Sequence, residues 1–331
     1  MDFSPIKEAE QFLLDSDIQV NHISDTRKYW FVRTEGGEYY EDFTLNDYIA
    51  IGWNDVPFVL QSEQTEALLK KVSELGHGQP RRVLNQVYRF YKEMHKDDIV
   101  VIPSEASHIF AFGYLTDDDV YEINDNSPET INCPFTRRRK INWVAGVPRS
   151  RIDSKLFSFF RNQQAISDAQ EYAEYIERAI NTLYIKNGIA HFTLSVDSQN
   201  SPRALDIPYF MNGLLSRVAD LAKDLHVTDK DDFAEDELSV RINVQSPGVI
   251  EFLGDPVFVL LCSVVLIALF GGKLKVKHNP KETSGELSTD GLAGFVLKVL
   301  DKYKNIRNMS DVKMLEIQKR MDIQNPSKKS K

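Results

Sequence analysis

The feature that most limits how this chain can fold is a series of short apolar segments in its first 145 residues. Each is rich in β-branched and aromatic residues and places Trp, Tyr, Arg or Pro at one end, which is typical of strands. Between the second and third segments, residues 63–75 and 83–94 repeat their apolar positions at helical spacing. We therefore predict a small mixed α/β barrel with two inserted helices. Its expected strands are Tyr29–Arg33, Tyr48–Trp53, Asp98–Pro103, Ile109–Tyr114 and Arg138–Trp143.

The character of the sequence changes after Pro148, which predicts two domains of an α+β protein. Residues 1–150 form the first domain, with one short helix expected within its first 25 residues. Residues 151–188 are polar and amphipathic, so we expect a helical connector. Residues 189–305 form a small α/β domain, and residues 306–331 a basic tail. Within the second domain we expect strands at 189–196, 238–244 and 249–253 and a helix at 209–225.

Charge is distributed unevenly along the chain. The net charge is −9, and residues 1–150 alone hold 16 basic and 25 acidic side chains. Residues 298–331 hold ten basic and four acidic side chains. A basic tail can contact phosphate or anionic lipid, but a solvated, frayed end explains the same composition. The acidic first domain excludes a protein that coats DNA by charge alone.

The two cysteines, Cys133 and Cys262, lie far apart. This excludes a disulfide framework and a cysteine-rich metal site. No charged segment followed by an apolar one begins the chain, so no secretory signal is expected. We expect a cytoplasmic protein.

A search for catalytic patterns finds none. Gly271-Gly272-Lys273 lacks the spacing of a phosphate-binding loop, and the seven histidines have no ligand spacing. Lys273-Leu274-Lys275 lacks the acidic residue of a nuclease metal site. We therefore predict no catalytic residue, no metal and no cofactor, with a diverged nuclease kept as an alternative.

The segment Pro256–Gly272 is uncharged and apolar. Its length, about 17 residues, is the lower limit for crossing a bilayer. A helix buried in the second domain or in a dimer interface explains the same residues, and triggered membrane insertion is the alternative. The side chains expected at this membrane or interface surface are Val257, Phe258, Leu261, Val265, Leu269 and Phe270.

The first domain resembles a known family. Arg33, Ile51-Gly52-Trp53, Asp98-Ile99-Val100-Val101, the strand containing Gly113, and Lys140-Ile141-Asn142-Trp143 together resemble a PUA-like domain over residues 26–150. More narrowly, they resemble the EVE-type or N-terminal domains of Mrr-like restriction proteins and other bacterial defence proteins. Such domains bind nucleic acid, and several hold a flipped, often modified base in an aromatic cage. The resemblance implies the same use here.

A flipped base needs aromatic walls, a few polar groups for its edge and cations for its phosphates. Candidate walls are Trp30, Phe43, Trp53 and Phe110, candidate edge readers are Arg33 and Asp42, and candidate phosphate ligands are Arg137, Arg138, Arg139 and Lys140. The alternatives stay open at this stage. Trp30 and Trp143 also suit a barrel core, and the basic cluster also suits a solvated face.

We therefore expect a non-catalytic, nucleic-acid-sensing protein of a bacterial defence or restriction-type system. The expected ligand is DNA, and one form of the hypothesis is that the DNA carries a modified base. Binding would be coupled to self-association or to a partner protein. The alternatives are a membrane-acting effector that uses the helix at 256–272, and the diverged nuclease.

Overall fold

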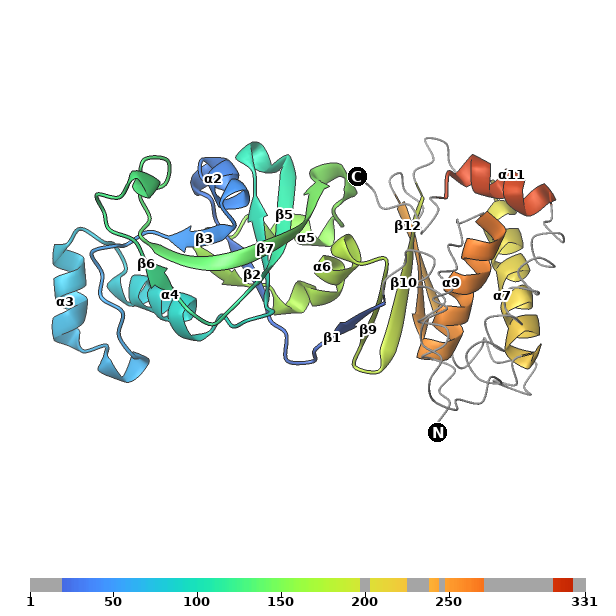
Figure 1. Cartoon of the computed structure of the whole chain (residues 1–331), viewed down its shortest axis with the longest axis horizontal. Coiled ribbons are helices and arrows are strands. Elements are labelled where there is room, and N and C mark those ends of the chain that lie inside the picture. The colour runs from blue at the N-terminus through green and yellow to red at the C-terminus, as the bar shows by residue number, and fades with distance from the viewer. Residues whose placement is uncertain (1–19, 197–202, 225–237, 244–247, 271–311, 324–331) are drawn as a thin grey trace, which may run out of the picture. The chain divides into compact units, whose positions relative to one another are not determined.

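A computed structural model describes residues 20–196, 203–224, 238–243, 248–270 and 312–323 of the chain (Figure 1). The chain forms two compact units. The curled-sheet unit contains Thr26–Ile180, and the five-stranded unit contains Met1–Asp25 and Asn181–Lys331. Each combines one mixed β-sheet with helices, so the predicted α+β class is confirmed. Most of the segment in which the first short helix was predicted lies outside the described residues.

The curled-sheet unit is built on a seven-stranded sheet with the order β3-β7-β5-β4-β2-β8, and β6 pairs with β7 off this path. Strands β2 and β4 are parallel, and the other pairs are antiparallel. All five predicted strands are present. The strands are β2 (Tyr29–Val32), β3 (Tyr48–Ile51), β4 (Ile99–Pro103), β5 (Ile109–Leu115), β6 (Tyr121–Glu122), β7 (Arg137–Pro148) and β8 (Ile166–Asp168).

Strand β7 makes the sheet curl into a half-barrel, and Figure 1 shows it as a long curved ribbon. Its first residues pair with β3, whereas Ile141 to Pro148 pair with β5. The register with β5 shifts between Phe112 and Gly113, which bends and twists the pair locally. A Cβ atom at Gly113 would lie 2.8 Å from the carbonyl oxygen of Asn142, so the close approach requires glycine.

Helices cover both faces of this sheet. One core contains Trp30 and Val32 and packs against α3 and α4, and the other contains Tyr29 and Phe31 and packs against α5 and α6. These four residues are consecutive on β2, so their side chains alternate between the two faces of the sheet. The helices are α2 (Tyr40–Leu45), α3 (Glu66–Glu74), α4 (Pro80–Lys92), α5 (Lys155–Phe159) and α6 (Ala173–Ile180). The predicted connector thus holds two helices, but also β8 and β9 (Leu183–Lys186), which were not predicted.

The segment after β2 forms the short 3-10 helix η1 (Glu35–Gly37). Both glycines have positive φ, at 74° and 106°. A Cβ atom at Gly37 would lie 2.1 Å from the backbone nitrogen of Glu105, in the second short helix η3 (Glu105–Ser107). Glycine is therefore required at position 37 for both its backbone conformation and its close contact.

The five-stranded unit has the sheet order β1-β9-β10-β12-β11, with β1 parallel to β9 and the other pairs antiparallel. The further strands are β1 (Asn21–Ile23), β10 (Ile189–Val196), β11 (Leu238–Asn243) and β12 (Gly248–Gly254). Helices α7 (Asp206–Asp224) and α9 (Pro256–Phe270) pack on the face that carries Phe192 and Leu194. The strands and the helix predicted for this region are confirmed.

The apolar segment forms α9, and its side chains belong to a protein core. Phe258, Leu261, Val265 and Leu269 are buried and Val257 is half-buried; the side chain of Phe270 lies outside the described set. A helix of 15 residues spans about 22 Å, less than the roughly 30 Å of a bilayer core. No helix within the described ranges is long and apolar enough to cross a membrane.

Part of the predicted basic tail is ordered against the same core. Helix α11 (Val312–Met321) buries Met314, Ile317 and Met321, and Ile323 makes an isolated bridge with Val196. The expectation of a frayed end is therefore wrong for residues 312–323. Burial of these apolar side chains orders the segment in spite of its positive charge.

A buried arginine ties β7 to the end of α4. Arg139 is fully buried and donates hydrogen bonds to the carbonyl oxygens of Phe90 (2.8 Å), Met94 (2.6 Å) and Asp117 (3.0 Å). Burial lowers the pKa of its guanidinium, and nearby Asp118 opposes the shift. Arginine nevertheless stays charged at neutral pH, and a cation near a helix C-terminus is favourable.

We predict that Arg139→Met destabilises the curled-sheet unit by about 3 kcal/mol or more, because three carbonyl groups lose a charged donor. All three tryptophans, Trp30, Trp53 and Trp143, lie in this unit, so tryptophan emission during urea unfolding reports on it selectively. Lys140→Met, which removes one exposed charge from the same strand, is the matched control and should shift stability by less than about 0.5 kcal/mol. Equal unfolding midpoints for both variants would contradict this role of Arg139.

We also predict that neither thiol reacts in the native protein. Cys133 and Cys262 are both fully buried, and burial raises the pKa of each thiol above its usual value. A buried neutral thiol is a poor nucleophile. Titration with Ellman's reagent at pH 8 should show no fast reaction until urea is added, and then two thiols per chain. Fast stoichiometric labelling of the folded protein is the opposing result.

Candidate functional site

Trp30, a predicted wall, is part of the core. Its indole N–H donates to Asp98 Oδ2 at 2.8 Å, and the cationic groups of Lys28 and Arg89 lie 5.9 and 5.7 Å from its ring centre. The side chain is 1% exposed. Of the two alternatives for Trp30, the structure therefore shows packing in the core.

Two other predicted walls are fully buried on different faces of the sheet. Phe43 packs with Tyr48 at a ring distance of 5.1 Å, in the core that includes α3 and α4. Phe110 stacks on Phe160 at 4.0 Å, in the opposite core. The structure does not bring these two side chains together.

The two predicted edge readers are also apart. Asp42 accepts hydrogen bonds from Tyr48 Oη and from Asn46 Nδ2, the latter at 2.9 Å, which holds it near the start of β3. Arg33 follows β2, and its backbone N–H donates to Ala165 O at 2.9 Å. By strand alternation Arg33 faces away from Trp30. Neither side chain is joined to the end of β3 by a contact that the structure describes.

Trp53, the fourth predicted wall, differs from the other tryptophans. It follows β3, is half-buried and has φ of 62°, a left-handed conformation that bulky residues rarely adopt. Within the described residues its indole N–H has no hydrogen-bond partner, whereas those of Trp30 and Trp143 donate to Asp98 and to Phe43 O. Trp53 therefore keeps an unused donor beside a partly accessible ring.

The loop that carries Trp53 is held in place from the sheet. Arg137 Nη1 donates to Trp53 O at 3.0 Å, and Arg137 Nη2 donates to Val56 O. The Asn54 side chain donates to Pro134 O at 2.9 Å and accepts from Thr136 N at 3.2 Å. Left-handed backbone of this kind costs about 1–3 kcal/mol and persists where the surroundings over-determine it, as at ligand sites.

Further aromatic side chains lie beside this loop. The Phe135 ring lies against Gly52, where a Cβ atom would be 3.1 Å from it, and contacts Tyr39 edge-on at 4.9 Å. We call Tyr39, Trp53 and Phe135 the aromatic rim. Phe135 and Trp53 are half-buried, and both pack on the same core. Tyr39 is buried, and burial together with a hydrogen bond to the neighbouring Glu38 carboxylate raises the pKa of its hydroxyl.

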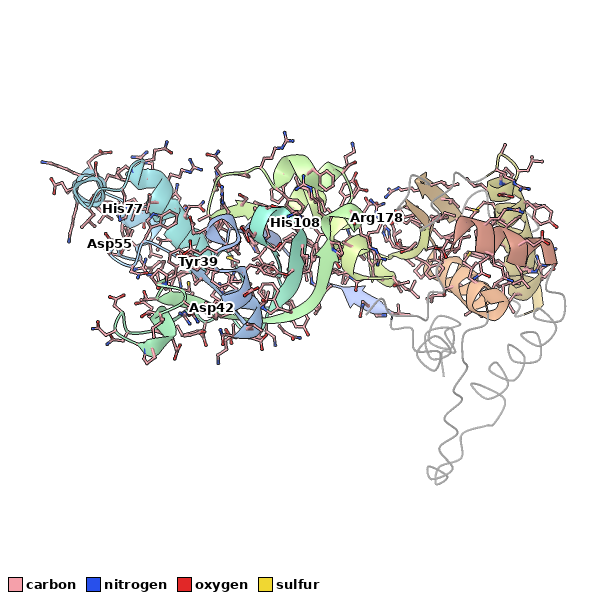
Figure 2. All side chains as sticks on the ribbon, turned by 90° about the horizontal axis from the view of Figure 1, so that it is seen from above. Tyr39, Asp42, Asp55, His77, His108 and Arg178 are labelled. Carbon is pink, nitrogen blue, oxygen red and sulfur yellow. The ribbon has the colours of Figure 1, made fainter. Side chains whose placement is uncertain are left out.

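A side-chain hydrogen bond holds the loop from another side. His77 Nε2 lies 2.9 and 3.0 Å from the two carboxylate oxygens of Asp55, and this pair links the loop to the connection between α3 and α4. Figure 2 shows Asp55 and His77 together, apart from Tyr39 and Asp42. The loop therefore has one anchor in the sheet and one in the helical layer.

The predicted phosphate cluster is mostly buried. Arg137, Arg138 and Arg139 are 5%, 3% and 0% exposed, and only Lys140 is exposed. Arg138 donates to the carbonyl oxygens of Phe135 (3.1 Å) and Glu129 (2.8 Å), and its guanidinium lies 4.0 Å from the Tyr48 ring centre. Because these donors bind carbonyl groups, the three arginines do not present an open track for phosphate.

The arrangement suits stacking and hydrogen bonding. The rim offers the half-buried rings of Trp53 and Phe135 and the Trp53 N–H, beside a backbone that is held in place. The described parts of this region contain no nucleophile placed against a base. Sequence reasoning found Trp53 but missed Tyr39 and Phe135; their signals were weak, since Tyr39 follows a glycine turn and Phe135 precedes the arginine run.

The comparisons with known proteins match the same part of the chain. A family model described as a domain of unknown function, DUF8426, matches residues 28–166. No curated protein matches the chain. The matched segment includes the aromatic rim and six of the seven strands of the curled sheet, and it ends at the first residue of β8.

We predict that Arg137→Met releases the Trp53 loop. Two carbonyl groups lose their donor, so the free energy of opening the loop should fall by about 1.4 kcal/mol or more. The amide hydrogens of residues 53–56 should therefore exchange at least tenfold faster. Hydrogen exchange followed by mass spectrometry measures this. Lys140→Met is the control, and unchanged protection of the loop in Arg137→Met would contradict the anchoring role.

Proposed function

We propose that the curled-sheet unit is a PUA-like, EVE-type reader that binds nucleic acid without cleaving it, and that the aromatic rim contacts a base. The observation that carries this proposal is Trp53, which has a half-buried ring, an unpaired indole N–H and a left-handed backbone held by Arg137. Such a side chain costs stability, so we infer that it is kept for a ligand.

The chemistry of a nucleobase fits this rim. Stacking of a base on an aromatic side chain contributes about 1–3 kcal/mol and tolerates every base. Discrimination then requires polar groups at the edge of the ring, because a wrong base leaves them unpaired. The Trp53 N–H is such a group, and it is a donor. A base that presents acceptors is therefore the preferred ligand.

The curled, half-barrel sheet is the fold on which this proposal builds, and the match over residues 28–166 is to a domain of unknown function, so the naming of the family and of the ligand is our proposal. In a defence or restriction-type setting, the five-stranded unit would couple binding to self-association or to a partner. That coupling rests on the sequence argument alone.

We predict that Trp53→Ala weakens DNA binding roughly 5- to 100-fold, as expected from the loss of one stacking contact. Fluorescence anisotropy with single- and double-stranded DNA, each with plain and modified cytosine, measures the change for the full chain. Trp53→Phe should retain part of the affinity, because it keeps a ring but loses the N–H donor.

Leu45→Ala is the matched control, since Leu45 is an apolar side chain of the same unit that is 79% exposed. It should bind like the wild type. Equal affinity of Trp53→Ala and wild type for every substrate would remove the rim from the proposal. Absence of binding to all four substrates by the wild type would remove nucleic-acid recognition itself.

A further inference from the structure

A shallow hollow lies on the curled-sheet unit, on the face that packs against α5 and α6. It has a volume of about 420 Å³ and is lined by Phe159, Arg161, Asn162 and Tyr172. These residues belong to the end of α5, the loop before β8, and the short helix η6 (Gln170–Tyr172). The volume lies within the range of small-molecule sites, which is about 300–1,000 Å³.

The floor of the hollow is aromatic and firmly packed. Tyr172 stacks on Phe159 with ring centres 4.7 Å apart and an interplanar angle of 29°. Phe159 in turn contacts Phe31 of β2 at 5.7 Å, so the stack stands on the core of the sheet. Tyr172 is half-buried, which leaves part of its surface accessible.

The polar groups around this floor are all hydrogen-bond donors. Within the part of the chain that the structure describes, the Arg161 guanidinium and the Tyr172 hydroxyl have no hydrogen-bond partner. Asn162 Oδ1 accepts from Gln164 N at 3.1 Å, which leaves its amide N–H groups for a ligand. No carboxylate is among the described residues that line the hollow. A set of unpaired donors that includes a cation matches an anion, above all a phosphate.

The segment that contributes Phe159 and Arg161 to the hollow is basic, whereas the segment that contributes Tyr172 holds Asp168 and Glu171. Residues 149–161 contain four basic side chains and one acidic side chain, Asp153. Asp153 is paired with Arg178 at 2.6 Å, so its charge is compensated locally. Arg149 is exposed and its guanidinium lies 4.7 Å from the ring centre of Phe157.

We propose that this hollow binds a nucleotide unit, with the phosphate on Arg161 and Asn162 and the base against the ring of Tyr172. The site is separate from the aromatic rim and does not depend on it. A phosphorylated base can come from a free nucleotide or from a single strand of nucleic acid, and the two sources share this chemistry.

The test measures binding to the full chain with three probes: adenosine monophosphate, inorganic phosphate, and a short fluorescein-labelled single-stranded oligothymidylate. We expect Arg161→Gln to weaken binding at least tenfold, because a charged hydrogen-bond donor is lost. Tyr172→Leu should weaken nucleotide binding about fivefold or more and Tyr172→Phe much less, since only the former removes the ring. The salt dependence of strand binding should become shallower by about one ion in Arg161→Gln.

Arg82→Gln is the matched control, because Arg82 is an exposed arginine on α4 of the same unit. It should change binding less than about twofold. Arg161-sensitive binding of adenosine monophosphate identifies a free nucleotide as ligand, and Arg161-sensitive binding of the oligonucleotide alone identifies a strand. Arg161 is exposed, so its replacement should leave the tryptophan-detected unfolding midpoint unchanged and the result interpretable.

Three results overturn the proposal: no binding of nucleotide or strand by the wild type, equal affinities of wild type and Arg161→Gln, or inorganic phosphate binding as tightly as adenosine monophosphate. Trp53→Ala measured in parallel separates this inference from the proposed function. Loss in Trp53→Ala alone supports the rim and overturns the hollow, whereas loss in Arg161→Gln alone does the reverse.

Discussion

The hydrogen bonds from the buried arginines of β7 to main-chain carbonyl groups are the interaction on which the curled-sheet unit depends. Arg137 binds the loop after β3, Arg138 binds the segment before β7, and Arg139 binds the end of α4. Buried carbonyl groups that lack a donor are costly, and irregular segments cannot satisfy one another as strands do. A guanidinium group offers five donors in a planar array, so one side chain serves several carbonyl groups at once.

This use of arginine also explains why the sequence alone misled us about the basic cluster. A run of four cations is typical of a solvated face or a phosphate contact, because unpaired charges are rarely buried. Their partners are carbonyl oxygens that lie 45 and 49 positions away for Arg139 and 84 positions away for Arg137. No local pattern encodes such partners. The strands were predictable because β-branched and aromatic composition is local, whereas the direction of each arginine is set by the fold.

For the other elements too, those with a local sequence pattern were predictable and those without one were not. Strands β1 and β8 have three residues each, too few for an alternation to be recognised. By contrast, Met314, Ile317 and Met321 recur at helical spacing in α11. This helix could have been predicted from the sequence in spite of the positive charge of the tail. In the candidate site, Trp53 stood out as a tryptophan at a strand end. Tyr39 and Phe135 join it only through the curl of the sheet, which places the segment before β7 beside Gly52.

The positions of the buried and exposed cations bear on how an acidic unit could recognise a negatively charged polymer. The overall field does not favour a negatively charged ligand, because residues 26–180 carry 24 acidic and 19 basic side chains. The arginines of β7 do not alter this, because their charge is directed inward at carbonyl groups. What remains is local: aromatic surface with the unpaired Trp53 N–H at the rim, and the hollow near α5 lined by Arg161, Asn162 and Tyr172. Recognition by such sites would depend on stacking and on a few charged hydrogen bonds, so it would show a shallow salt dependence. A domain of this kind would bind most of a nucleic acid weakly and would bind best where a base is already accessible.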